Sequence, residues 1–136
     1  MYFGFAGTAW ALFEASKALD APRLLAQSVE LVSALPTSWP NADITHGTSG
    51  LGSALLHLAE QTDDRRLRLR AEACADDVAD RVLRTGRDRS WRVPDTFDSR
   101  LAGSSSLGFA PGTAGIGPSL LAVGTRLGRE DLVDLA

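Results

Sequence analysis

Two side chains that can exchange protons, Asp43 and His46, lie three residues apart in a short loop before an apolar segment. A carboxylate beside a reacting thiol or enolate can take or relay a proton, and an imidazole can act as a general base near neutral pH. Each also has a structural interpretation. Asp43 could form a turn or cap a helix, and His46 could be a solvated or backbone-bonded loop residue. Both are therefore candidate catalytic residues with both interpretations open.

The loop runs into two glycines, Gly47 and Gly50, and the same spacing recurs at residues 4–7 and 112–115. Each pair precedes an apolar run. Glycine lets a loop turn sharply and lets a helix end approach its neighbour closely. Alternatively, the helix N-termini of all three motifs could present N–H groups to one ligand. A phosphate-binding loop is disfavoured, because no Lys-Ser or Lys-Thr follows any of the pairs.

Other reactive or aromatic residues are expected to pack rather than to act. His57 lies in an apolar helical segment and is predicted to be a hydrogen-bonded core histidine, and Cys74 is predicted to be buried. One cysteine allows no internal disulfide, which is typical of a reducing cytosol. No metal-ligand spacing surrounds Cys74, so we expect no metal and no cofactor. Trp10, Trp39 and Trp91 either pack or line a peptide groove.

The elements that must position these residues are helical. Hydrophobic periodicity and capping signals predict helices over residues 9–19, 22–35, 47–60, from 65 to a stop at Gly86, over 115–127 and from 129 onward. Pro22 suits the first turn of the second of these, and residues 62–64 form the expected cap region of the fourth. Segments after a glycine motif are apolar nearly all round, which favours burial on most sides, whereas those between are amphipathic. Residues 87–111 are predicted to form a long irregular loop, with a short strand or hairpin allowed near Trp91. The pattern predicts an all-α fold of about three antiparallel helical hairpins in an inner and an outer layer.

Composition sets the broad class. The chain has 136 residues, 44% of them hydrophobic and 23% charged, which suits one folded domain. A net charge of −3 gives no basic surplus for nucleic acid. The apolar runs are too short to cross a membrane, and the first residues lack the basic region of a signal peptide. We therefore expect a cytoplasmic protein.

Three stretches, residues 2–10, 39–50 and 108–117, resemble the repeats of lanthionine synthetase C-like cyclases. The closest resemblance is to the cyclase domain of class III (kinase–cyclase) lanthipeptide synthetases. It implies an α/α toroid, of which residues 1–136 would form a partial cyclase domain. It also implies addition of a cysteine thiol of a precursor peptide to a dehydrated Ser or Thr, giving a thioether ring. The implied partners are the precursor peptide and the rest of a larger synthetase chain.

The resemblance assigns roles to two positions. Asp43 matches the family's acidic residue before the second motif, which faces the central cavity. Pro111 stands where family members commonly have a histidine proposed as acid or base, and proline has no proton to transfer. Class I and II cyclases bind zinc through two Cys and one His in later repeats, which are absent here, so no zinc is expected. We expect little activity from the chain alone.

Two alternatives to a cyclase remain. The chain could be a non-catalytic helical-repeat module that binds a leader peptide or a partner protein, which Pro111 and the missing metal ligands favour. A carbohydrate-active toroid enzyme is more distant, because no convincing pair of carboxylates stands at the motif ends.

Overall fold

The computed structural model describes residues 4–136 and confirms an all-α fold. Its elements, in chain order, are α1 (Phe5–Ala18), α2 (Pro22–Ala34), α3 (Thr48–Thr62), α4 (Arg65–Asp80), β1 (Leu83–Thr85), β2 (Asp88–Ser90), α5 (Thr113–Leu127) and α6 (Glu130–Leu135). Met1, Tyr2 and Phe3 lie outside the described residues. The expectation of no signal peptide and the start of the first resembling stretch depend on them.

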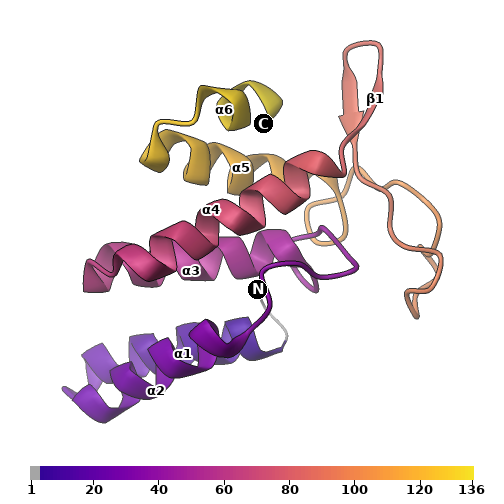
Figure 1. Ribbon diagram of the computed structural model, residues 1–136. Helices are drawn as coiled ribbons and strands as arrows, with labels where there is room; N and C mark the ends of the chain where they lie inside the picture. The colour runs from indigo at the N-terminus through magenta and orange to yellow at the C-terminus, as the bar shows by residue number, and fades with distance from the viewer. Residues whose placement is uncertain (1–3) are drawn as a thin grey trace.

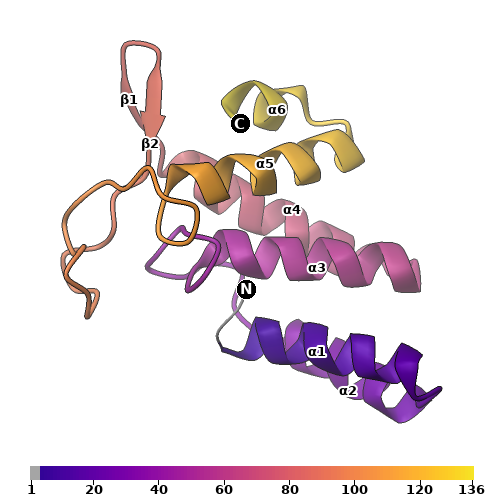
Figure 2. The ribbon, with the colours of Figure 1, turned by 180° about the vertical axis from the view of Figure 1, so that it is seen from behind.

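Consecutive helices pair into three hairpins, α1–α2, α3–α4 and α5–α6, with the α3–α4 hairpin in the middle (Figure 1). Seen from behind, α1, α3 and α5 form one layer in front of α2, α4 and α6 (Figure 2). The N-terminal ends of α1, α3 and α5 lie at the same end of the molecule, which we call the motif end (Figure 2). The predicted two layers of helical hairpins are therefore observed.

Within the layer formed by α1, α3 and α5, the middle helix is buried more fully than the helix at the edge. α3 buries ten of its fifteen residues, since α4, α5 and α1 all pack against it. α1 buries only Ala9, Phe13 and Ser16, whereas Phe5 at its start and Leu19, its C-terminal cap, are exposed. The prediction of burial on most sides is thus wrong for α1. Its main neighbours among the described residues are α2 and α3, so its remaining side meets solvent.

The fourth helix is shorter than predicted. α4 ends at Asp80 instead of continuing to residue 86, and Gly86, with φ +63°, turns the β1–β2 hairpin. Antiparallel pairing of Leu83 with Ser90 gives these residues the backbone bonds that another helical turn would have supplied. The hairpin allowed near Trp91 is confirmed. The following loop is closed by backbone hydrogen bonds between Val93 and residues 103 and 104.

The fifth helix starts earlier than Pro118 suggests. α5 begins at Thr113, so the proline occupies its second turn. Proline lacks an N–H, so the carbonyl four residues earlier, at Ala114, receives no bond from it. Both residues are exposed, and water can serve that carbonyl.

None of the helices in residues 4–136 has the length and hydrophobicity that crossing a bilayer would require.

Candidate functional site

The loop before α3 wraps around the start of that helix. Each of the first three N–H groups of α3 donates to a carbonyl seven residues earlier: Thr48 to Asn41 (3.0 Å), Ser49 to Ala42 (3.2 Å) and Gly50 to Asp43 (3.4 Å). These are donors that a helix N-terminus usually leaves without an intrahelical partner. The alternative that this helix end offers these N–H groups to a ligand is therefore wrong for the second motif.

Glycine is needed at the two later motifs for space. A Cβ atom on Gly47 would lie 2.2 Å from the carbonyl oxygen of Asn41, and one on Gly112 would lie 2.0 Å from that of Ser106. In both motifs the crowding oxygen belongs to the residue six positions earlier, and the N–H of Thr113 donates to Ser106 (3.0 Å) as that of Thr48 does to Asn41. The glycines are thus part of one repeated scaffold.

Helix α4 fixes the first half of the loop. Arg81 donates to the carbonyls of Trp39 and Pro40, to the Ser38 hydroxyl and to Asp77, and Arg70 donates to the carbonyl of Leu35. From the other side, the N–H of Trp39 donates to Oγ1 of Thr48 (3.0 Å). The backbone that leads to Asp43 is therefore held between α3 and α4.

Asp43 is buried, with 1% of its surface exposed. Its Oδ1 accepts hydrogen bonds from the N–H groups of Thr45 (2.9 Å) and His46 (2.6 Å), and its Oδ2 accepts one from Nδ2 of Asn41 (2.9 Å). These contacts shape the turn, as the structural interpretation of Asp43 expects. They also keep one carboxylate oxygen next to the following histidine.

His46 is the exposed member of the pair. Nδ1 of its imidazole lies 3.7 Å from Oδ2 of Asp43, and 46% of the side chain is exposed. The ring centroid lies 5.8 Å from that of Phe97, which belongs to the loop after β2. A ligand at this end therefore meets the imidazole first, while the buried carboxylate stands behind it.

A cavity of about 240 Å³ opens beside this pair, and we call it the histidine cavity. Asp43, His46, Phe97 and Pro111 line it together with Asn41, Val93, Ser99, Leu101 and Ala110. Pro111 thus shares a cavity with the two candidate catalytic residues. In this cavity the position where the resemblance expects a second proton-transfer group offers only an apolar ring.

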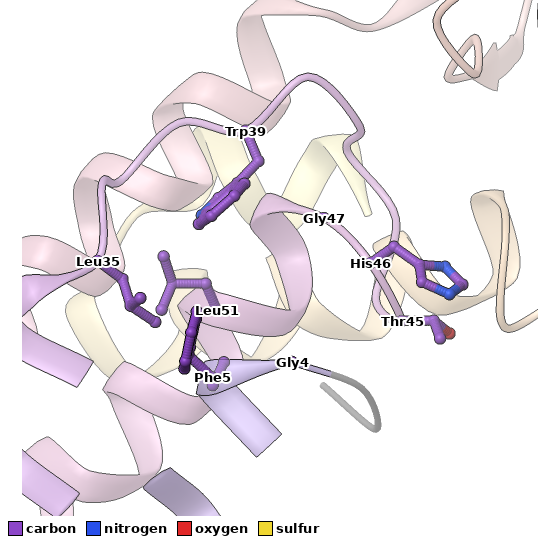
Figure 3. Close-up of a pocket in the computed structure, with 9 residues that line it drawn as sticks. Gly4, Phe5, Leu35, Trp39, Thr45, His46, Gly47 and Leu51 are labelled. Atoms are coloured by element: carbon purple, nitrogen blue, oxygen red, sulfur yellow. The ribbon is translucent and has the colours of Figure 1, made fainter. Parts of the chain in front are cut away.

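A second cavity, of about 250 Å³, lies on the other side of the His46 backbone, and we call it the tryptophan cavity. It is lined by Gly4, Phe5, Ala6, Leu35, Trp39, Thr45, His46, Gly47 and Leu51. The side chains of Phe5, Leu35, Trp39 and Leu51 gather in it, whereas the imidazole of His46 points away from Trp39 (Figure 3). The two cavities therefore flank His46.

Other singled-out residues lie apart from this pair. His57 Nε2 lies 3.2 Å from Oε1 of Glu14, and its ring stacks on Trp10 at a centroid distance of 4.0 Å. It is hydrogen-bonded as predicted, although 25% of its side chain is exposed.

Cys74 is buried, and burial raises the pKa of its thiol to about 12. Trp91 is buried and donates to the carbonyl of Val78, so it packs.

A zinc site of two Cys and one His does not fit these residues. The chain has one cysteine, which is buried as a neutral thiol, and in residues 4–136 no group of three His, Cys, Asp or Glu side chains is placed to hold a metal ion. No chemical step is therefore assigned to a metal.

Sequence reasoning missed three residues that build the site: Thr45, Arg81 and Phe97. Phe97 lies in an irregular loop without periodicity, and nothing in the sequence pairs it with His46. Arg81 is one of several arginines near the end of α4. Only Thr45, within the motif, carried a signal that could have been noticed.

The comparison with protein families gives one match. The family described as "Lanthionine synthetase C-like protein" matches residues 1–136. Neither the curated proteins nor the solved structures gave a match.

Proposed function

The chain belongs to the lanthionine synthetase C-like family, and on that premise we propose that it is part of a cyclase domain that closes thioether rings in a precursor peptide. The observation that carries this proposal is the pairing of a buried carboxylate, Asp43, with the exposed imidazole of His46 at a cavity. A carboxylate behind a histidine is the arrangement that orients an imidazole for proton transfer.

The proposed reaction moves one proton and forms one bond. His46 takes the proton of a cysteine thiol, and the thiolate sulfur attacks Cβ of a dehydrated Ser or Thr. The electrons of the C=C bond move to Cα and its carbonyl as an enolate. The imidazolium then returns its proton to Cα. The product has the mass of the reactant, with one S–C bond and one C–H bond in place of S–H and the C=C π bond.

Asp43 acts through His46 in this proposal. Its carboxylate is held in place by two backbone N–H groups and the Asn41 amide. With Oδ2 of this carboxylate 3.7 Å from Nδ1, Asp43 helps to fix which way the imidazole faces. Pro111 supplies no proton, so His46 serves both proton transfers.

We further propose that these three hairpins are a part of a class III-type toroid. The motif ends of α1, α3 and α5 lie together, as they would around one end of a closed ring (Figure 2). Leu19, the C-terminal cap of α1, is exposed, which supports a further hairpin packing at this edge of the molecule. The partners are then the precursor peptide and the rest of a synthetase, in the cytoplasm, without nucleic acid.

A non-catalytic role is the second candidate. Pro111 in the histidine cavity and the mainly apolar lining of the tryptophan cavity both suit a module that only binds a leader peptide. In that case Asp43 serves to shape its turn.

The test uses the longest natural protein that carries this chain and a dehydrated peptide with one cysteine. Thioether formation removes the free thiol without changing the peptide mass, which thiol alkylation and mass spectrometry together detect. Loss of alkylation at unchanged mass supports a cyclase. Peptide binding without thiol loss, unaffected by Asp43→Asn, supports the binding module instead.

A further inference from the structure

The tryptophan cavity has no part in the proton transfers, although it adjoins them. It shares Thr45 and His46 with the rest of the site, yet its other lining residues carry no charge. At about 250 Å³ it lies below the range of roughly 300–1,000 Å³ typical of sites for drug-sized ligands. It therefore suits a single large side chain.

The aromatic wall of this cavity is rigidly placed. The backbone of Trp39 is bound on one side by Thr48, at the start of α3, and on the other by Arg81, the C-terminal cap of α4. Its indole remains half-buried, beside Leu35 and Leu51, instead of entering the core as Trp91 does (Figure 3). A partly exposed aromatic side chain on a held backbone, with only two rotatable side-chain bonds, binds an apolar group at little cost in conformational entropy.

Phe5 forms the outer edge of the cavity. Its side chain is 63% exposed, although it is large and apolar. Polar groups for orienting a small-molecule ligand are few here, since among the lining side chains only those of Thr45 and His46 and the indole N–H of Trp39 are polar. An apolar side chain of a longer molecule suits this lining better than a free polar metabolite does.

We infer that the tryptophan cavity is a specificity pocket that holds one large apolar side chain of the substrate peptide, near the residue that reacts at His46. This inference rests on the proposed function for the identity of the ligand as a peptide. A leucine or phenylalanine in the pocket fixes the peptide on one side of His46. The reacting groups then enter the histidine cavity on the other side.

The probe is a set of fluorescent peptides in a Gly/Ser/Asn background, each with one dehydroalanine and a serine in place of cysteine so that no ring forms. One leucine is placed at successive positions around the dehydroalanine, and binding is measured by anisotropy. At one or two positions leucine should lower Kd about tenfold relative to alanine, as expected for burying one aliphatic side chain. In Trp39→Ala that gain should fall below about twofold, giving a clear coupling.

Phe5→Ser is a second variant, and because Phe5 is mostly exposed the chain should fold with it. It should weaken the same leucine gain, whereas Leu69→Ala, on the exposed side of α4, should leave the gain unchanged. A leucine gain that is absent, or that persists in both cavity variants, overturns the inference. Thiol loss on a cysteine-containing peptide is measured separately. Leucine-dependent binding without thiol loss contradicts the cyclase proposal but supports the specificity pocket. Thiol loss without a leucine gain contradicts only the specificity pocket.

Discussion

The hydroxyl of Thr45 donates a hydrogen bond to the carbonyl oxygen of Ala110, at 3.0 Å, across 65 residues of sequence. It joins the loop that carries His46 to the loop that carries Pro111. The two sides of the histidine cavity are thereby held together. The geometry at His46 therefore depends on a contact between two repeats.

We expect Thr45→Val to lower the free energy of unfolding by about 1 kcal/mol, because a part-buried hydrogen bond is lost at nearly constant volume. Urea unfolding measures the change. Thr8→Val is the matched control. Thr8 bonds only within its own helical turn at an exposed site, so its replacement should cost less than about 0.5 kcal/mol. Equal effects of both variants would contradict the role given to Thr45.

Gly47→Ala and Gly112→Ala should each destabilise the protein by about 2–3 kcal/mol, since each new Cβ would overlap a backbone carbonyl. Their φ angles, −128° and −157°, suit alanine, so lack of space is the cause. Gly86→Asn is the control. Gly86 has φ +63° and open space, which asparagine tolerates, and its replacement should have little effect. Thermal melts of the three variants make the comparison. Melting temperatures close to the wild type for Gly47→Ala and Gly112→Ala would contradict the close approach of loop and helix start in these two motifs.

The thiol of Cys74 should resist modification and make stability fall at alkaline pH. Its pKa rises from 9.0 to about 12 on folding, mainly through burial. The neutral thiol stabilises the fold fully below about pH 9, and this contribution is lost as pH rises toward 12. The wild type should therefore lose up to about 1 kcal/mol per pH unit relative to Cys74→Ala above pH 9. Rapid labelling of the folded protein at neutral pH would refute the buried position.

Asp64 should stabilise α4 in a pH-dependent way. It caps the helix by accepting from the N–H of Arg66, and the guanidinium of Arg66, followed by that N–H, lowers the pKa of the carboxyl from 3.8 to about 2. Because the folded value is the lower one, the contribution is present above about pH 4 and is lost as pH falls through 2. Asp64→Asn keeps the cap but not the charge. Its melting temperature should lie below that of the wild type at about pH 6, and the two should converge near pH 2. A difference that persists at pH 2 would contradict this assignment.

Local physics in the sequence accounts for most of the helices. Pro22 at the first position of α2 and Asp64 as the cap of α4 are short-range signals, and both are observed. The end of α4 was predicted wrongly because β1 pairs with β2. Residues 83–85 make their backbone hydrogen bonds to residues 88–90 instead of continuing the helix. Hydrophobic periodicity reports which residues share one helix face, so it does not indicate that this segment pairs with a neighbouring strand instead.

The site was predicted only in part. Asp43 and His46 were singled out as candidates from their types and from the motif that contains them, and the structure places them together at one cavity. Phe97 beside His46, and the bond from Thr45 to Ala110, could not be found, because they depend on how the repeats stack. Pro111 was expected to supply no proton-transfer group, and the structure places it in the lining of the histidine cavity.

The most direct test of the central claim is the rate of thiol loss from a dehydrated, cysteine-containing peptide, measured with the longest natural protein that carries this chain. His46→Ala should slow it at least about 100-fold, as expected for removal of a general base and acid. Asp43→Asn should slow it less, and Leu69→Ala should leave it unchanged. A wild-type rate in His46→Ala would show that the imidazole has no part in ring closure and would contradict the account.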